Sequence, residues 1–145
     1  MKVLIIDDEL VNLENLVEAI VKTGQDFSVL RAKSAQMALR ILESETPDII
    51  ITDWDMPQMN GIEMIAYLKQ NPITSEIPVI MSSGKMTSPE HLKIALDAGA
   101  VDYIRKPVDK TELIARVHSM LKLVNSYKKI REQHLLIVES DKLKL

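Results

Sequence analysis

Short apolar runs alternate along the chain with longer segments in which apolar residues recur every three or four positions. The short runs are rich in Ile, Val and Leu, as strands covered on both faces must be. They predict strands at residues 3–6, 27–32, 48–52, 77–82 and 101–104. The longer segments predict amphipathic helices at residues 11–22, 35–43, 62–70, 89–98 and 110–123. Polar residues stand where N-caps of four of these helices belong: Ser34, Asn60, Ser88 and Asp109.

This order of elements is (βα)5 and indicates the α/β class. Right-handed crossovers fold such a chain into one doubly wound, parallel five-stranded sheet with helices on both faces. The 145 residues suit a single domain, and no internal repeat or low-complexity segment interrupts them. In an open sheet of this kind ligands bind outside the carboxyl ends of the strands. We therefore look for functional residues at the predicted strand ends.

Composition and charge exclude several function classes. Hydrophobic residues make up 46% and charged residues 27% of the chain, which is typical of an ordered globular protein. The net charge of -3 gives no general electrostatic reason to bind nucleic acid, and we expect no direct nucleic-acid binding by this segment. There is no cysteine, which excludes disulfides, thiolate catalysis and cysteine metal sites. No signal peptide or transmembrane run is recognisable, so we expect a cytoplasmic protein without a membrane partner.

Charged and hydroxyl residues gather where the predicted strands end. They are Asp7, Asp8 and Glu9 after the first strand, Asp53 and Asp55 after the third, Ser82 and Ser83 at the fourth, and Lys106 after the fifth. Crowded carboxylates raise one another's pKa unless cations compensate, and Mg²⁺ is a hard cation that prefers carboxylate, carbonyl and phosphate oxygens. An aspartate can also accept a phosphoryl group directly. These residues therefore predict a magnesium-dependent phosphoryl-transfer site.

Five motifs, in the same order, resemble those of response regulator receiver domains (CheY-like) of two-component signalling. They are IIDDE (5–9), TDWDMPQMNG (52–61), PVIMSSG (78–84), AGA (98–100) and DYIRKP (102–107). The resemblance covers residues 1–123 and implies a flavodoxin-like fold. It also implies a histidine kinase or histidine phosphotransfer protein as partner. We accordingly expect a receiver domain at 1–123 and a helical extension or linker at 124–145.

The same resemblance assigns the phosphoacceptor and the metal ligands. Asp53 is similar to the family's phosphoacceptor. The side chains of Asp8 and Asp53 and the backbone carbonyl of Asp55 resemble its Mg²⁺ ligands, while Asp7 would act through water. Asp55 and Lys85 lie where the family tunes the lifetime of the phosphate.

The resemblance further identifies a switch. Ser83 matches the switch hydroxyl, Lys106 the lysine that contacts the phosphate, and Tyr103 the aromatic residue that changes rotamer with phosphorylation. The peptide between Lys106 and Pro107 would be cis, which X-Pro bonds tolerate at small cost. Phosphorylation would shift the surface formed by the fourth helix, fifth strand and fifth helix. The protein would catalyse its own phosphorylation and dephosphorylation and would not be an enzyme for other substrates.

Two alternatives remain open at this point. Haloacid dehalogenase-like phosphatases also use a strand-end DxD followed by a Ser or Thr and a Lys, although Asp7 and Asp8 precede the DxD here. The second alternative is a pseudo-receiver that only binds a partner, which has little support because Asp8, Asp53, Ser83 and Lys106 are all intact. Taken singly, Ser83 and Tyr103 are compatible with turn and packing roles, and Gly61 and Pro57 with turn chemistry. The three histidines, His91, His118 and His134, are interpreted as solvated helix residues.

Beyond residue 123 the pattern is weaker. From Met120, the residues Leu123, Tyr127, Ile130, His134 and Ile137 follow spacings of three and four. This would extend the last helix with a short coiled-coil seam and a possible homodimer, but two heptads fall short of a convincing repeat. The segment LLIVES (135–140) is equally compatible with a strand or an unpaired tail. An output domain after residue 145 and a complete chain are both open.

Overall fold

The computed structural model describes residues 1–23 and 26–143 and shows five strands that alternate with five helices. The strands are β1 (Lys2–Ile6), β2 (Ser28–Ala32), β3 (Ile49–Asp53), β4 (Val79–Ser83) and β5 (Asp102–Arg105). The helices are α1 (Leu10–Val21), α2 (Ala35–Leu42), α3 (Gly61–Lys69), α4 (Pro89–Ala98) and α5 (Lys110–Leu143).

All strand pairs are parallel, and the order in the sheet is β2-β1-β3-β4-β5. This confirms the predicted doubly wound α/β fold with a C-terminal helical extension. The register places Ile6 opposite Thr52 and Asp53 opposite Ser82. Consequently the residues that follow β1, β3 and β4 meet at one edge of the sheet.

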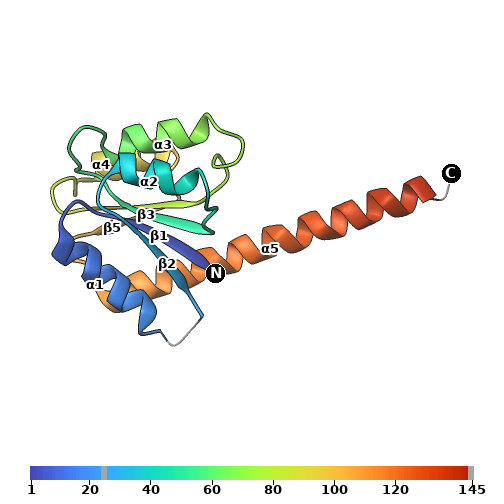
Figure 1. Ribbon diagram of the computed structural model, residues 1–145, viewed down its shortest axis with the longest axis horizontal. Helices are drawn as coiled ribbons and strands as arrows, with labels where there is room; N and C mark the ends of the chain where they lie inside the picture. Colours follow the sequence, from blue (N-terminus) through green and yellow to red (C-terminus); the bar gives the residue numbers. More distant parts are fainter. Residues whose placement is uncertain (24–25, 144–145) are drawn as a thin grey trace.

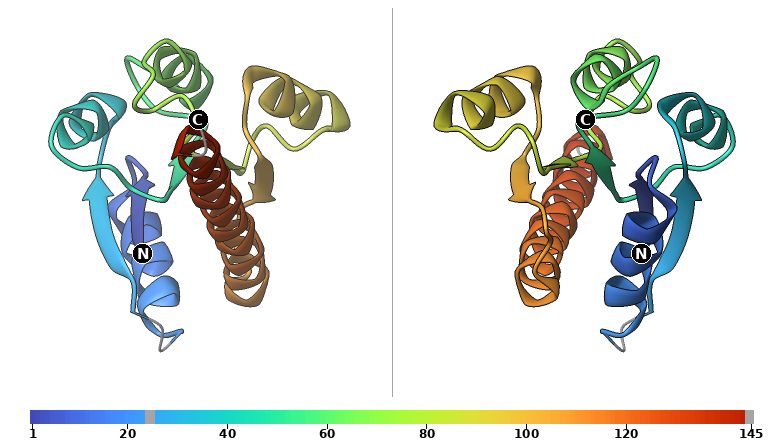
Figure 2. Two further views of the ribbon diagram at one scale, coloured as in Figure 1. Left: turned by 90° about the vertical axis from the view of Figure 1, so that its right-hand side faces the viewer. Right: turned by 90° about the vertical axis from the view of Figure 1, so that its left-hand side faces the viewer.

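The helices form two layers around the sheet, α1 and α5 on one face and α2, α3 and α4 on the other (Figures 1 and 2). Leu4, Ile6 and Ile50 face the second layer, whereas Val3, Ile5 and Ile51 face the first. The central strands are therefore buried on both faces, which explains their continuous apolar runs.

Several element ends differ from the prediction by one or two residues. β3 and β4 continue through Asp53 and Ser83, although polar side chains had placed the ends one residue earlier. The backbone pairing of the two strands persists there, since Asp53 is still opposite Ser82. The four predicted caps are confirmed, because each side chain accepts a hydrogen bond from a backbone N–H of the first helical turn: Ser34, Asn60, Ser88 and Asp109.

Helix α5 is the longest element, with 34 residues, and its C-terminal half projects from the body of the molecule (Figure 1). Leu113, Val117 and Leu121 are buried against the sheet and α1, whereas Tyr127 and Ile130 are exposed. The strand and unpaired-tail alternatives for 135–140 are wrong, since this segment is helical. Residues 144 and 145 of the expected extension lie outside the described residues. Within the described part of the chain, no helix has the length and apolarity needed to cross a membrane.

Two ion pairs fasten the beginning of the projecting segment to loops at the amino ends of the strands. The Lys128 Nζ lies 2.9 Å from an oxygen of Asp48, and Arg131 pairs with Glu76. Between these pairs, a cavity of about 530 Å³ is lined by residues that include Pro47, Ile77, Val124 and Tyr127.

Candidate functional site

Three carboxylates converge at the carboxyl edge of the sheet. Asp7 and Asp8 follow β1, Asp53 ends β3, and one oxygen from each lies within 4.8 Å of the other two. Asp7 is fully buried and Asp53 is 5% exposed, whereas Asp8 is exposed to solvent. Two buried acids and one accessible acid, all with hard oxygen donors, fit a divalent cation such as Mg²⁺ that retains part of its water shell.

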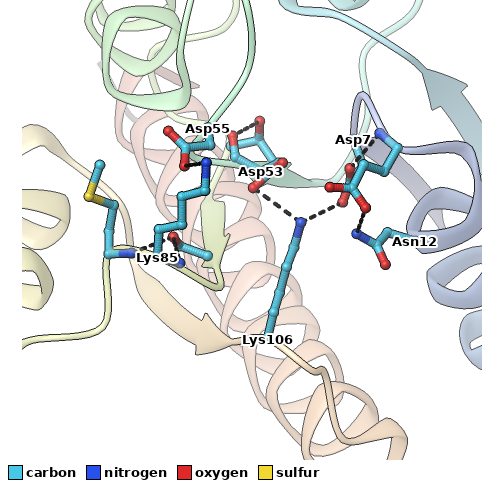
Figure 3. Close-up of polar contacts among 10 residues, drawn as sticks. Asp7, Asn12, Asp53, Asp55, Lys85 and Lys106 are labelled. Atoms are coloured by element: carbon cyan, nitrogen blue, oxygen red, sulfur yellow. Dashed lines mark hydrogen bonds and ion pairs between the residues drawn. The ribbon is translucent and has the colours of Figure 1, made fainter.

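Lys106 provides the positive charge among these acids (Figure 3). Its Nζ lies 2.9 Å from Asp7 Oδ2 and 3.2 Å from Asp53 Oδ1, and its side chain is only 16% exposed. Its backbone N–H donates to the Ser83 carbonyl, and the peptide to Pro107 is cis, as expected. Burial lowers the pKa of Lys106, but the hydrogen bond to Asp7 and the nearby carboxylates more than offset this and raise it overall. The ammonium group therefore stays charged.

The carboxyl group of Asp53 titrates far from its ordinary range. Burial raises its pKa, the charge of Lys106 lowers it, and the charge of Asp7 raises it, with a net pKa of about 6. One lysine thus leaves the ionised form of Asp53 less stable than it is in water. A bound divalent cation would favour the ionised form.

Asp55 lies beside the three carboxylates, but its side chain belongs to a separate contact. An oxygen of Asp55 is 3.7 Å from the Nζ of Lys85, which is 84% exposed (Figure 3). Such an exposed pair contributes little to stability. The carboxylate of Asp55 therefore lies at the rim of the site, outside the cluster of Asp7, Asp8 and Asp53.

Ser83 and Tyr103 lie on neighbouring strands, with the serine fully buried at the end of β4. The Ser83 Oγ accepts hydrogen bonds from the backbone N–H groups of Met86, at 2.9 Å, and Lys85, at 3.2 Å. Tyr103 is 7% exposed, and its hydroxyl has no hydrogen-bond partner among the described residues. Burial raises the pKa of this phenol, and the neighbouring Ser83 side chain and the charge of Arg105 offset only part of that rise. The tyrosine is thus turned into the protein in this structure.

Gly61 has a role that the sequence did not reveal. It is the first residue of α3, and a Cβ at this position would lie 2.7 Å from the carbonyl oxygen of Asp53 and from the Met81 Sδ. Its N–H donates to the Trp54 carbonyl at 2.9 Å. Glycine is needed here because α3 begins in direct contact with the backbone of the Asp53 strand, and the turn chemistry predicted for it is not the reason.

The prediction that all three histidines are solvated is wrong for two of them. His91 is half-buried and packs against Trp54, and His118 is half-buried with its ring 6.2 Å from that of Phe27. The His118 Nε2 is buried without a hydrogen-bond partner among the described residues. His134 is exposed, as predicted. These contacts join residues far apart in the sequence, so the local pattern could not show them.

Comparison with known proteins identifies the family. The sequence model of the family described as "Response regulator receiver domain" matches residues 3–118 of this chain. PhoB, the phosphate regulon transcriptional regulatory protein of Pseudomonas aeruginosa, is 35% identical over 120 residues, which cover 83% of this chain and 51% of PhoB. The "Probable cyclic di-GMP phosphodiesterase" of Vibrio cholerae is 38% identical over 119 residues, 82% of this chain and 26% of that protein. The chain thus spans about half and about a quarter of the length of these two relatives.

Solved structures agree with this result. A response regulator from Desulfuromonas acetoxidans has a TM-score of 0.75 at 33% identity, with 84% of this chain and 97% of that chain covered. The receiver domain of the Francisella response regulator 1452 has a TM-score of 0.76 at 30% identity, with 83% and 96% covered. None of these similarities supports a haloacid dehalogenase-like phosphatase. The fold, the convergent acids with Lys106 and these similarities show that the chain belongs to the response regulator receiver domain family of two-component signalling.

Proposed function

We propose that Asp53 accepts a phosphoryl group from a phosphohistidine of a histidine kinase or phosphotransfer protein. An oxygen of the ionised Asp53 carboxylate attacks phosphorus, the P–N bond to the donor histidine breaks, and a P–O bond to Asp53 forms. The observation that carries this proposal is the position of the Lys106 Nζ between Asp7 and Asp53, next to the oxygen that would receive the phosphoryl group. A lysine in that place can neutralise charge on the transferred oxygens.

The carboxylates of Asp8 and Asp53 and the carbonyl of Asp55 would hold Mg²⁺ in this proposal, with Asp7 acting through water. When bound, Mg²⁺ supplies positive charge that favours the ionised nucleophile and offsets the charge of the phosphoryl oxygens. Asp7 also accepts hydrogen bonds from Lys106 Nζ and the Glu9 N–H, which fix its orientation. Hydrolysis of the acyl phosphate by water would restore Asp53, and Asp55 and Lys85 at the rim are placed to influence that water's access.

Ser83 would serve as the hydroxyl that reports the phosphate. Its Oγ is an acceptor for two N–H groups of the loop after β4, so its own proton is free to be donated. Donation to a phosphoryl oxygen would draw the end of β4 towards Asp53, and Tyr103 on the next strand would adjust its packing. The expected consequence is a changed surface at α4, β5 and α5.

The wider context belongs to the same proposal. Residues 1–123 would form the receiver domain and 124–145 the extension that leads to an output domain, in a cytoplasmic protein that acts only on its own phosphoryl group. The two relatives carry a transcriptional regulator's name and a phosphodiesterase's name, so they do not single out one output.

We also propose that the extension pairs with a second copy of this chain. Leu123, Tyr127, Ile130 and Ile137 are 49% to 63% exposed and follow a spacing of three and four on α5. We call this stripe, together with His134, the seam. Such a stripe is self-complementary when two copies of the helix lie in register. The ion pairs of Lys128 and Arg131 hold a neighbouring side of the helix to the domain, and Tyr127, which also lines the cavity between these pairs, is still 63% exposed.

The test of phosphorylation is the intact mass after incubation with Mg²⁺ and acetyl phosphate. We expect one added phosphoryl group in the wild type and none in Asp53→Ala or in the presence of EDTA. Lys129→Ala serves as the control, because this exposed lysine lies on α5, away from the acidic site, and should leave the modification in place. Absence of the adduct with both acetyl phosphate and a phosphorylated donor protein would refute the proposal.

A further inference from the structure

Trp54 connects the phosphoacceptor strand to two other elements. It directly follows Asp53, is 6% exposed, and its ring packs edge-to-face against His91 of α4 and Tyr103 of β5. The ring centroids are 5.8 Å from His91 and 6.4 Å from Tyr103, with interplanar angles of 83° and 84°. Both arrangements have the geometry that aromatic pairs favour.

His91 also closes the N-terminus of α4. The Ser88 Oγ accepts from the His91 N–H at 3.2 Å, and the His91 Nδ1 accepts from the Ser88 N–H at 3.3 Å. This is a capping box, in which the third helical residue is most often Glu or Gln. Either would satisfy the Ser88 N–H, but neither has a ring that could reach Trp54. Histidine at this position therefore combines the cap with an aromatic contact to the strand that carries Asp53.

The backbone around Trp54 is held tightly on both sides. Its N–H donates to the Ser82 carbonyl and its carbonyl accepts from the Gly61 N–H, both at 2.9 Å. The indole ring is consequently the part of this segment that reaches α4. A displacement of Asp53 and Ser82 that moves this backbone must either carry the His91 ring along or break the aromatic contact.

We infer that His91 is a positioning residue that couples the first turn of α4 to the phosphoacceptor strand through Trp54. The coupling itself depends only on the packing, whereas its use as a signal rests on the proposed phosphorylation of Asp53. Phosphorylation-dependent movement of the strand end would then reach α4 through the indole and imidazole rings, in addition to any movement of Ser83 and Tyr103.

Two substitutions separate the cap from the ring. His91→Gln retains a capping group and removes the aromatic contact, and His91→Phe retains a ring and removes the capping nitrogen. Amide hydrogen exchange in the first two turns of α4, without phosphodonor, should accelerate when Trp54→Leu is introduced into the wild type. An aromatic pair predicts an increase of about two- to tenfold. In the His91→Gln background the same Trp54→Leu substitution should have little further effect.

The outcome of this cycle decides the inference without reference to phosphorylation. Equal acceleration by Trp54→Leu in both backgrounds would overturn it, and so would a His91→Phe variant that has lost the coupling to Trp54. Urea unfolding of each variant identifies any global loss of stability, and Trp54→Met, which also lacks an aromatic ring, replaces Trp54→Leu if the latter does not fold. His134→Gln, an exposed histidine on α5, is the matched control and should leave α4 unchanged.

A second measurement connects the coupling with the proposed function. Trp54 is the only tryptophan, so the emission comes from the indole that contacts His91 and Tyr103, and the His91→Gln variant isolates the part that depends on His91. With Mg²⁺ and acetyl phosphate, we expect the wild-type emission to change and the change to be at least halved in His91→Gln, at equal phosphorylation by intact mass. An unmodified mass in both proteins would count against the proposed function, and equal emission changes at equal phosphorylation would count against the use of His91 as a signal.

Discussion

At the scale of single residues, the site is governed by an imbalance of charge. Three carboxylates share one buried ammonium group, and the most strongly affected acid is Asp53, whose pKa is raised to about 6 mainly by burial. Because the pKa of Asp53 is higher in the folded than in the unfolded chain, ionised Asp53 lowers the free energy of unfolding. The residue that would perform the chemistry therefore reduces stability near neutral pH in the absence of a cation.

Replacing Asp53 with Asn should stabilise the metal-free protein in a pH-dependent way. Because the folded pKa lies above the unfolded value of about 3.9, the stability associated with the protonated acid is lost as the pH rises through about 6. We expect the free energy of unfolding of Asp53→Asn, relative to wild type, to rise by about 1–3 kcal/mol between about pH 4.5 and 7.5. Urea unfolding in EDTA measures this difference, and a pH-independent difference would contradict the raised pKa.

Magnesium should make the wild type more stable than Asp53→Asn, the reverse of the order expected in EDTA. Binding to the native carboxylates stabilises the wild type by mass action, whereas Asp53→Asn has lost one ligand and should gain less. Melting temperatures at increasing Mg²⁺ concentrations, near neutral pH, provide the measurement. Asp55→Asn is the control, because the expected metal contact of Asp55 is its backbone carbonyl and is retained.

Gly61 should tolerate no side chain. An added Cβ would meet the Asp53 carbonyl oxygen at 2.7 Å, and backbone cannot move aside as a flexible side chain can. We expect Gly61→Ala to lower the free energy of unfolding by about 1–3 kcal/mol, as overpacking does, and to slow phosphorylation. Gly84→Ala is the matched control, since the nearest contact there is the Lys106 Cβ at 3.4 Å. Equal effects of the two substitutions in urea unfolding would contradict the steric argument.

At the scale of elements, the local pattern predicted what depends on local sequence. The apolar runs of β1, β3 and β4 and the caps Ser34 and Ser88 specify strands and helix starts within a few residues. The meeting of Asp7, Asp53 and Lys106 followed from a general rule, because parallel strands end at one edge. By contrast, the contacts of Gly61 with Asp53 and of Trp54 with His91 depend on how α3 and α4 pack against the sheet. Local sequence patterns do not predict that packing.

Helix α5 is one element with two environments, and its amides should show this. Leu113, Val117 and Leu121 are anchored in the core, whereas the ion pairs that the described residues show for the projecting part are those of Lys128 and Arg131. Hydrogen exchange should therefore be slow up to about residue 121 and faster beyond, as expected of a helix with little tertiary packing. Lys128→Ala with Arg131→Ala should accelerate exchange near residues 124–131, whereas Lys129→Ala should not. Uniform protection along α5 in the monomer would contradict this division.

At the scale of the whole molecule, the projecting helix distinguishes this chain from a receiver domain alone. If the seam pairs two copies, sedimentation should show a mass that rises with concentration towards twice that of one chain. Ile137→Lys would place a charge in the seam and should keep the protein monomeric. Leu136→Lys is the matched control, because this neighbour is similarly exposed but lies off the seam. Loss of the dimer in both variants, or in neither, would argue against the seam.

The length of α5 also has a mechanical consequence. The helix begins close to Lys106, at the edge where the phosphoryl group would bind, and its 34 residues span about 50 Å at 1.5 Å per residue. A tilt of about 5° at its first turn would displace the far end by about 4 Å by simple leverage. In this way small shifts of the buried first turns of α5 would become displacements comparable to the width of a side chain at its far end.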